Sequence, residues 1–271
     1  MKDLKNKNVL ITGGASGIGK LMGKLVLEKG GNLIIWDINS KNIDLTLAEL
    51  SSLGKISTYI VDVSNSEVVR ETAAMVLQEH GVVDVLINNA GIIVGKYFHE
   101  HSTEDIDRTM MINALAPMYV TAEFLPAMMV QKSGHICNIA SSAGLVSNPK
   151  MSVYAASKWA MIGWSDSLRL EMEQLEMNIG ITTVNPFYID TGMFEGVRSK
   201  VPILKPEKVA KKIIKAIEQD RIFLTMPWSM HLVRFSQGIF PVKFFDLLMG
   251  RVLGMYKTMD HFEGRKDQPT I

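Results

Sequence analysis

The sequence has one cysteine, almost no net charge and no long hydrophobic run. The lone Cys137 among 271 residues excludes an internal disulfide and any metal site built from several cysteines. The 29 basic and 28 acidic residues leave a net charge of +1, and without a Lys/Arg run we expect no nucleic-acid partner. No apolar stretch reaches the roughly 18 residues of a membrane span, and the polar N-terminus contains no signal core. We therefore expect a soluble protein of a reducing compartment.

Short apolar runs alternate with longer amphipathic stretches through most of the chain. The runs are continuously apolar rather than alternating, which is typical of parallel strands covered on both faces. The βαβα alternation predicts an α/β fold with a doubly wound parallel sheet and helices on both faces. We expect strands at 8–12, 32–36, 56–61, 83–88, 135–139, 181–184 and 222–225, and helices at 17–28, 43–51, 64–80, before 131, 152–175 and 206–218. One domain spans 1–226, and a helical extension, 227–271, packs on this domain, a partner subunit or a membrane surface.

A glycine-rich turn, Thr12-Gly13-Gly14-Ala15-Ser16-Gly17-Ile18-Gly19, follows the first expected strand. Its glycines allow the backbone to approach a pyrophosphate, and the following helix offers free N–H groups and a partial positive charge. Glycine is also an ordinary turn residue, so the turn alone is a moderate signal. Asp37 follows the second strand, where a carboxylate can bind both adenosine ribose hydroxyls. The same carboxylate would repel a 2′-phosphate, and neither Ile38 nor Asn39 supplies a cation, so NAD is predicted over NADP.

Four further residues indicate acid–base chemistry. Tyr154 and Lys158 lie four positions apart on an expected helix, and their side chains therefore share one face. We expect the ammonium to lower the pKa of Tyr154, because tyrosine, with a pKa of about 10, is otherwise a poor catalyst near neutrality. Ser141 ends a strand and can hold a substrate oxygen, whereas Asn113 is a poor helix former within an expected helix. Each residue also has an ordinary structural explanation, and only their joint occurrence in a dinucleotide fold indicates a site.

Over about residues 6–225 the chain resembles the short-chain dehydrogenase/reductase family, in its compact, single-domain, Rossmann-type branch. This resemblance implies that Tyr154 is the proton donor or acceptor and that Ser141 orients the substrate oxygen. Lys158 would hold the nicotinamide ribose and tune Tyr154, and Asn113 would support a water in a proton relay. The matching motifs are Thr12-Gly13-x-x-x-Gly17-x-Gly19, Asp62-Val63, Asn88-Asn89-Ala90-Gly91, Asn113, Ser141, Tyr154 and Lys158.

The resemblance also implies a set of cofactor contacts. Asp62-Val63 would contact adenine, Asn89 the adenosine-side ribose, and Ile189 and Thr191 the nicotinamide carboxamide. The remaining expected cofactor residues are Gly13, Ser16, Gly17, Ile18, Gly19, Asp37, Ile38, Ala90, Gly91, Tyr154, Lys158 and Pro186. We expect no metal, because His99-Glu100-His101 falls in a surface loop without further ligands. A homodimer or homotetramer through helices around 113–131 and 152–175 is implied by the family.

One departure from the family pattern concerns the substrate side. The family usually has Pro-Gly after the sixth strand, whereas this chain has Pro186-Phe187. The segments 185–194, Trp36-Asp37-Ile38-Asn39 and Met259-Asp260-x-Phe262-x-Gly264-Arg265-Lys266 are similar to the branch of retinol and 17β-hydroxysteroid dehydrogenases. We predict a mobile lid at 193–201 and an apolar substrate pocket lined by Phe187, Tyr188, Met193 and Phe194.

Residues 227–256 are rich in large apolar side chains, among which Arg234, Lys243, Arg251 and Lys257 are interspersed. Such a stretch can lie on a membrane surface or line a lipophilic entrance, and packing against the domain or a partner subunit is equally open. Members of this branch commonly carry an N-terminal hydrophobic anchor, which this sequence does not show. We therefore expect a cytoplasmic protein, and peripheral membrane contact through its C-terminal segment stays open as an alternative.

The predicted function is NAD-dependent oxidoreduction, in which an alcohol and its carbonyl are interconverted by hydride transfer. The substrate is expected to be lipophilic, similar to a retinoid, a steroid or a fatty alcohol. One alternative is an NAD(H)-binding sensor or scaffold without turnover, which loss of Ser141, Tyr154 or Lys158 would have favoured. A sugar epimerase or dehydratase would need a longer chain and a Gly-x-x-Gly-x-x-Gly spacing.

Overall fold

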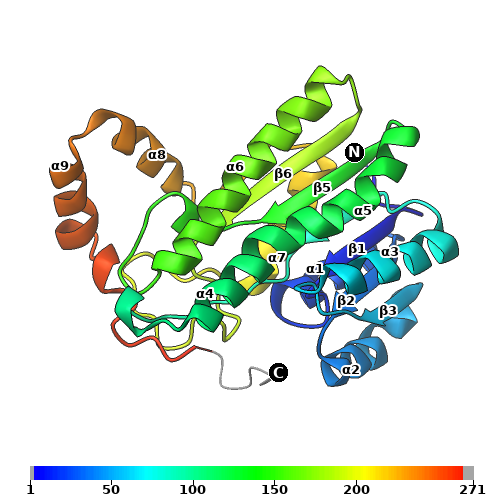
Figure 1. The fold of residues 1–271 in the computed structure, drawn as a ribbon, viewed down its shortest axis with the longest axis horizontal. Helices are drawn as coiled ribbons and strands as arrows, with labels where there is room; N and C mark the ends of the chain where they lie inside the picture. Colours follow the sequence, from blue (N-terminus) through cyan, green and yellow to red (C-terminus); the bar gives the residue numbers. More distant parts are fainter. Residues whose placement is uncertain (1–2, 265–271) are drawn as a thin grey trace.

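A seven-stranded parallel sheet forms the centre of the computed structural model, which describes residues 3–264 (Figure 1). The strand order is β3-β2-β1-β4-β5-β6-β7, so the winding direction reverses between β1 and β4. Ligands bind outside the carboxyl ends of strands at such a switch point. The strands are β1 (Asn8–Thr12), β2 (Asn32–Asp37), β3 (Ile56–Ile60), β4 (Val85–Asn88), β5 (Gly134–Ile139), β6 (Ile179–Pro186) and β7 (Phe223–Met226).

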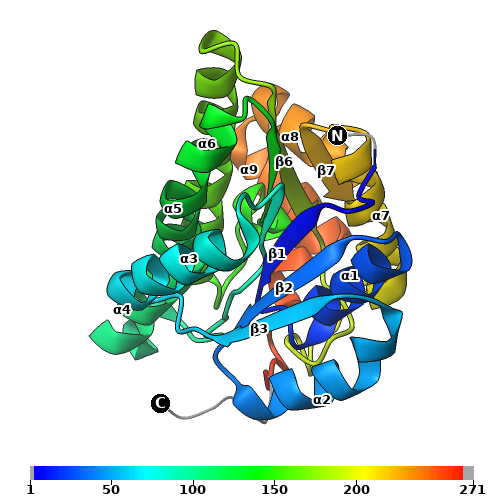
Figure 2. The same ribbon diagram turned by 90° about the vertical axis from the view of Figure 1, so that its right-hand side faces the viewer.

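Helices cover both faces of this sheet, which confirms the predicted doubly wound α/β class (Figure 2). Along β1, Val9 and Ile11 pack on one side, whereas Leu10 packs on the other. Successive side chains thus enter different cores, which explains why the strands are apolar throughout. One face carries α1 (Gly17–Glu28), α2 (Ser40–Leu50) and α7 (Pro206–Glu218); the other carries α3 (Ser66–His80), α5 (Ala116–Val130) and α6 (Ser152–Gln174), with α4 (Thr103–Met110) beside them.

The expected boundaries hold to within a few residues, with two informative differences. Helix α2 begins at Ser40, earlier than the predicted 43, because the side chain of Asn39 caps it by accepting a 3.0 Å hydrogen bond from the Asn42 N–H. The helical region predicted before residue 131 is divided, since a π-helical turn, Met111–Leu115, separates α4 from α5. Cys137 is buried within β5.

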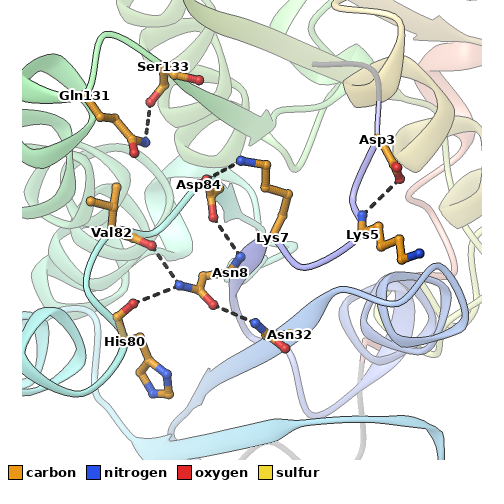
Figure 3. Close-up of polar contacts among 10 residues, drawn as sticks. All are labelled: Asp3, Lys5, Lys7, Asn8, Asn32, His80, Val82, Asp84, Gln131 and Ser133. Atoms are coloured by element: carbon orange, nitrogen blue, oxygen red, sulfur yellow. Dashed lines mark hydrogen bonds and ion pairs between the residues drawn. The ribbon is translucent and has the colours of Figure 1, made fainter.

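Asn8 and Asp84 form hydrogen bonds at the amino-terminal ends of the central strands, opposite the cleft side of the sheet (Figure 3). The Asn8 side-chain amide donates to the carbonyls of His80 and Val82, at 2.9 and 3.0 Å, and its oxygen accepts from Asn32. Asp84 accepts from the Asn8 N–H and from Lys7, both at 2.9 Å. These bonds tie β1 to β2 and to the segment before β4, so polar residues stabilise the amino-terminal end of the sheet.

The C-terminal extension forms an arm at one end of the molecule (Figure 1). It contains α8 (Met230–Ile239) and α9 (Val242–Asp246), followed by a π-helical turn, Leu247–Val252. Residues 265–271, including Arg265 and Lys266 of the late motif, lie outside the described residues. From residue 3 to 264, no helix combines the length and the apolar character needed to cross a membrane.

Candidate active site

A continuous cleft follows the carboxyl ends of the strands. It consists of two adjoining cavities, which share Gly13, Ser16, Ala90, Gly91 and Met193 in their walls. Of the predicted site residues, only Gly19 and Asn113 are not part of this lining. The smaller cavity is lined by Gly13, Ser16, Gly17, Ile18, Asn89, Ala90, Gly91, Ser141, Tyr154, Lys158, Pro186, Phe187, Tyr188, Ile189, Thr191, Met193 and Phe194, and the larger one by Asp37, Ile38, Asp62 and Val63.

The glycine-rich turn leaves no space for side chains at the point where the two cavities meet. Gly13 and Gly17 have φ values of +62° and +52°, in the left-handed region that favours glycine. A Cβ atom on Gly19 would lie only 2.2 Å from the Gly13 carbonyl oxygen. Ser16 begins α1 without a side-chain capping bond, so its hydroxyl and the first helix N–H groups can bind a ligand. This cradle therefore fits the pyrophosphate of a dinucleotide.

The turn is supported by the segment after β4. The Asn89 side chain donates to the carbonyls of Thr12 and Gly13, at 3.0 and 3.1 Å. The Thr12 hydroxyl accepts from the backbone N–H groups of Asn89 and Ala90. The motif Asn88-Asn89-Ala90-Gly91 thus holds the turn in place besides lining the cavity.

Asp37, the last residue of β2, places a carboxylate in the larger cavity. One of its oxygens accepts from the Ala15 N–H and the other from the Asn39 N–H, both at 3.0 Å. Each carboxylate oxygen keeps a further lone pair, so both can accept hydrogen bonds from ribose hydroxyls. Arg108 and Glu104 of α4 also line this cavity. No motif marked these two residues, because only the folding of α4 across the sheet brings them here.

Tyr154 and Lys158 project together into the smaller cavity from the first turns of α6. Both are at least nine-tenths buried, and the Lys158 Nζ lies 5.8 Å from the centre of the Tyr154 ring. This Nζ donates a 3.0 Å hydrogen bond to the carbonyl oxygen of Ile139. Burial lowers the pKa of Lys158 to about 8.

The predicted lowering of the Tyr154 pKa is wrong for this structure. Burial raises the pKa of Tyr154 to about 12, and a hydrogen bond with the Ser141 side chain opposes this change only in part. The ammonium of Lys158 is directed to a backbone carbonyl, so it does not outweigh the loss of water around the phenol. Ser141 accepts from the Ala143 N–H at 3.1 Å, and its own hydroxyl hydrogen is directed to Tyr154 in the cavity lining.

Asn113 lies in the π-helical turn rather than in a regular helix, and it acts from behind the cavity wall. Its side-chain oxygen accepts from the Ile92 N–H at 2.9 Å, and its amide donates to the Ile92 carbonyl at 2.8 Å and to Ser157 at 3.2 Å. A Cβ atom on Gly91 would lie 3.2 Å from the Asn113 oxygen and 3.6 Å from the Lys158 Nζ. Asn113 thus fixes the segment that approaches Lys158, and π turns of this kind occur frequently at functional sites.

Aromatic and sulfur-containing side chains cover the other side of Tyr154. The ring of Phe194 meets Tyr154 edge to face at 6.2 Å and Tyr188 at 5.0 Å, and Phe187 meets Tyr188 at 4.5 Å. Met193 completes this lining. The four residues predicted to form an apolar pocket are therefore brought together beside the acid–base pair.

The C-terminal extension contributes to the pocket, in line with one of the alternatives left open for residues 227–256, and so does the segment before α6, which was not predicted. Met255 and Asn148 line the cavity, and the hydroxyl of Thr258 lies 2.9 Å from that of Tyr188. The Asn148 amide donates to both hydroxyls, at 3.2 and 3.3 Å. These residues have no recognisable sequence signal, because their contacts join segments that are 40 to 110 positions apart.

The predicted lid is bonded to the same extension. In the segment 193–201, the Arg198 N–H donates to the Thr258 carbonyl at 3.2 Å, and the Glu195 carbonyl accepts from the Glu263 N–H at 2.9 Å. His99-Glu100-His101 lies elsewhere, in and beside a short 3₁₀ turn, Phe98–Glu100. Within residues 3–264, no three His, Cys, Asp or Glu side chains gather closely enough to hold a metal ion.

Comparison with known proteins agrees with this arrangement. The family model of short chain dehydrogenases matches residues 7–202. Epidermal retinol dehydrogenase 2 of Mus musculus is 36% identical over 98% of this chain and 88% of its own length, and retinol dehydrogenase 10-B of Danio rerio is 34% identical over 99% and 88%. A short chain dehydrogenase/reductase from Burkholderia phymatum, solved in complex with NAD, superposes with a TM-score of 0.81 at 25% identity and covers 88% of this chain and 95% of its own.

A doubly wound sheet with a pyrophosphate cradle beside a buried Tyr-Lys pair defines a nucleotide-dependent oxidoreductase of the Rossmann type. The chain belongs to the short-chain dehydrogenase family, as the match over 7–202 shows. It is accordingly an NAD(P)-binding oxidoreductase that acts on CH–OH groups.

Proposed function

We propose that this enzyme uses NAD to interconvert a lipophilic alcohol and its carbonyl compound, with Tyr154 as the acid–base group. The observation that carries the proposal is the position of Tyr154, Lys158 and Ser141 where the dinucleotide cleft meets an aromatic pocket. Bound NAD would supply hydride transfer at its nicotinamide ring. The remaining tasks, which are orientation, exclusion of water and proton transfer, fall to the residues of the chain.

Ser141 would bind the reacting oxygen first. The Ala143 N–H donates to the Ser141 hydroxyl and thus orients it, so that its hydrogen, which faces Tyr154 in the absence of substrate, can pass to the substrate oxygen. Tyr154 would then exchange a proton with the same oxygen. Its pKa of about 12 has to fall for this to occur near neutral pH, and positive charge introduced beside the phenol, together with Lys158, would lower it. Lys158 would also hold the nicotinamide ribose.

The remaining cofactor assignments follow the walls of the cleft. Asp62 and Val63 would contact adenine, and Ile189 and Thr191 would contact the nicotinamide carboxamide. Asn113, which holds the Ile92 backbone, would support a water in a proton relay.

The choice of NAD over NADP depends on Asp37. Its carboxylate would meet the 2′-phosphate of NADP at short range, and the adjacent Ile38 and Asn39 carry no compensating charge. Arg108 lines the same cavity from α4, so the two cofactors have to be compared directly.

The lipophilic substrate is supported by the pocket and by the relatives. Phe187, Tyr188, Phe194 and Met193 offer it mostly apolar surface. Several relatives are named retinol dehydrogenases, which agrees with a long apolar alcohol. We place the chemistry in residues 1–226 and assign the extension, 227–271, to closure of the pocket.

We further propose a cytoplasmic homodimer or homotetramer. The predicted interface ranges, 113–131 and 152–175, correspond to α5 and α6. Both helices expose apolar side chains suited to such an interface. Val130 is 88% exposed, and Trp159 and Leu170 are about half exposed.

The decisive experiment is a spectrophotometric assay of reduced-cofactor formation with NAD and NADP in parallel. The alcohols should include short alcohols, hydroxysteroids and retinol. We expect NAD-linked turnover of a lipophilic alcohol that Tyr154→Phe reduces by about 10³-fold or more, with NADH binding unchanged. Turnover that survives in Tyr154→Phe would refute the assigned role. Tight NADH binding without turnover of any alcohol would instead favour a sensor.

A further inference from the structure

Helix α8 is apolar on two opposite faces. Its inward side chains, Met230 and Val233, are buried in the cluster that contains Phe187 and Met255. A second stripe faces outward: Leu232, Phe235 and Ile239 follow at intervals of three and four residues on one face of the helix, and Trp228 lies in the turn just before it. This outward stripe consists of Trp228, Leu232, Phe235 and Ile239, which are 73, 53, 68 and 58% exposed.

The apolar surface continues from α8 into α9. Phe240 and Phe244 are in edge-to-face contact at 5.0 Å across the turn between the helices. Val242 and Phe244 of α9 are themselves 74 and 50% exposed. The two helices lie at the end of the molecule farthest from β3 and α2 (Figure 1). An apolar surface of this extent is typical of a face that binds a partner or a membrane.

The charges beside the stripe favour a membrane. Arg234, Lys243 and Arg251 are exposed, whereas Asp246 is the only acidic residue among 228–253 and accepts a 2.5 Å hydrogen bond from Tyr256. The whole chain, by contrast, is almost balanced in charge. Cations around an apolar face complement anionic lipid headgroups. A two-fold contact with a second copy would instead bring the same cations toward one another.

The segment that follows α9 contributes to the wall of the substrate pocket. Met255, a few residues after the π-helical turn, lines the cavity, and Thr258 bonds to Tyr188. A surface that held the outward stripe would therefore lie close to the pocket that contains Tyr154.

We propose that α8 and α9 dock on an anionic lipid bilayer, with the outward stripe inserted at the level of the headgroups and upper acyl chains. A lipophilic alcohol dissolved in the bilayer then reaches the pocket without crossing water. This source of substrate rests on the proposed function, whereas the docking itself does not.

The test measures vesicle binding separately from turnover. The full-length protein is sedimented with phosphatidylcholine vesicles, with or without phosphatidylserine. One variant carries Leu232→Glu with Phe235→Glu; its charge-matched control carries Leu45→Glu with Met75→Glu, at exposed positions of α2 and α3. We expect wild type and control to bind the anionic vesicles, the stripe variant to bind about 100-fold more weakly or worse, and high salt to weaken binding.

A second readout reports insertion. A lipid-linked quencher should reduce tryptophan emission in the wild type and much less in Trp228→Phe. Trp228 lies on the stripe and is 73% exposed, whereas Trp36 is buried and Trp159 and Trp164 lie on α6. Equal quenching of both proteins would overturn the proposal. Three other results would also overturn it: no binding to anionic vesicles, equal binding to neutral vesicles, or self-association that the stripe variant abolishes.

Turnover of a water-soluble alcohol with NAD separates the two proposals. The stripe variant should retain wild-type turnover, since its changes lie outside the cleft. Vesicle binding without turnover would refute the proposed function alone, and turnover without vesicle binding would refute the docking alone.

Discussion

Replacing Lys158 by methionine should abolish turnover and yet stabilise the cofactor-free protein at pH 7. Burial lowers the pKa of Lys158 from 10.5 to about 8. The unfolded chain therefore keeps this proton up to a higher pH than the folded chain does. Between about pH 8 and 10.5 the unfolded state binds more protons, so the contribution of Lys158 to stability rises with pH over this interval.

The magnitude follows from the two pKa values. Their separation corresponds to about 3 kcal/mol of destabilisation at pH 7, where both states are protonated. Methionine has a similar volume and no charge, but it cannot donate to the Ile139 carbonyl, which costs about 1 kcal/mol. We therefore expect Lys158→Met to be more stable by about 2 kcal/mol at pH 7. This advantage should vanish as the pH approaches 10.5.

Urea unfolding of both proteins without cofactor, from pH 6 to 10, tests this reasoning. The raised pKa of Tyr154 costs stability from about pH 10 to 12, but it is common to both proteins and cancels in their difference. Lys211→Met serves as the control, because Lys211 is exposed on α7 and its replacement removes a surface charge far from the buried pair. A Lys158→Met protein that is less stable than the wild type at pH 7, or a difference that is independent of pH, would refute the argument.

Three further predictions concern the cofactor cleft and its support. Asp37→Asn keeps an acceptor for the Ala15 N–H but removes the charge, and the ratio of kcat/KM for NAD to that for NADP should fall about ten-fold or more; an unchanged ratio would contradict the role of Asp37. Gly19→Ala places a methyl group 2.2 Å from a carbonyl oxygen of the turn, so fluorescence titration should show NADH affinity at least about ten-fold weaker. Asn113→Ala leaves both backbone groups of Ile92 without their side-chain partner, and denaturation should show a loss of about 2–4 kcal/mol; a loss below about 1 kcal/mol would mean that water replaces both bonds.

The sequence by itself was sufficient for the sheet, the cofactor turn and the acid–base pair. Continuous apolar runs can be buried only between two layers of helices, which determined the fold class. The glycine spacing and the four-residue separation of Tyr154 and Lys158 are local, because a strand, a turn and a helix place these residues within a few positions of one another. Asn113 was recognisable as a poor helix former, but the interruption of the helix there and its π geometry were not predicted.

Only the tertiary structure decided whether burial or the nearby ammonium controls the pKa of Tyr154, and which distant residues line the pocket. The pKa of Tyr154 depends on how completely the surrounding segments exclude water, and burial outweighs the nearby ammonium. Asn148 and Met255 enter the pocket through contacts between distant segments, which no local pattern encodes. The sequence also left open whether residues 227–256 pack inward or face outward. In the structure one face of α8 packs against the domain and the opposite face is exposed. Both faces are apolar, and the domain can cover only one of them.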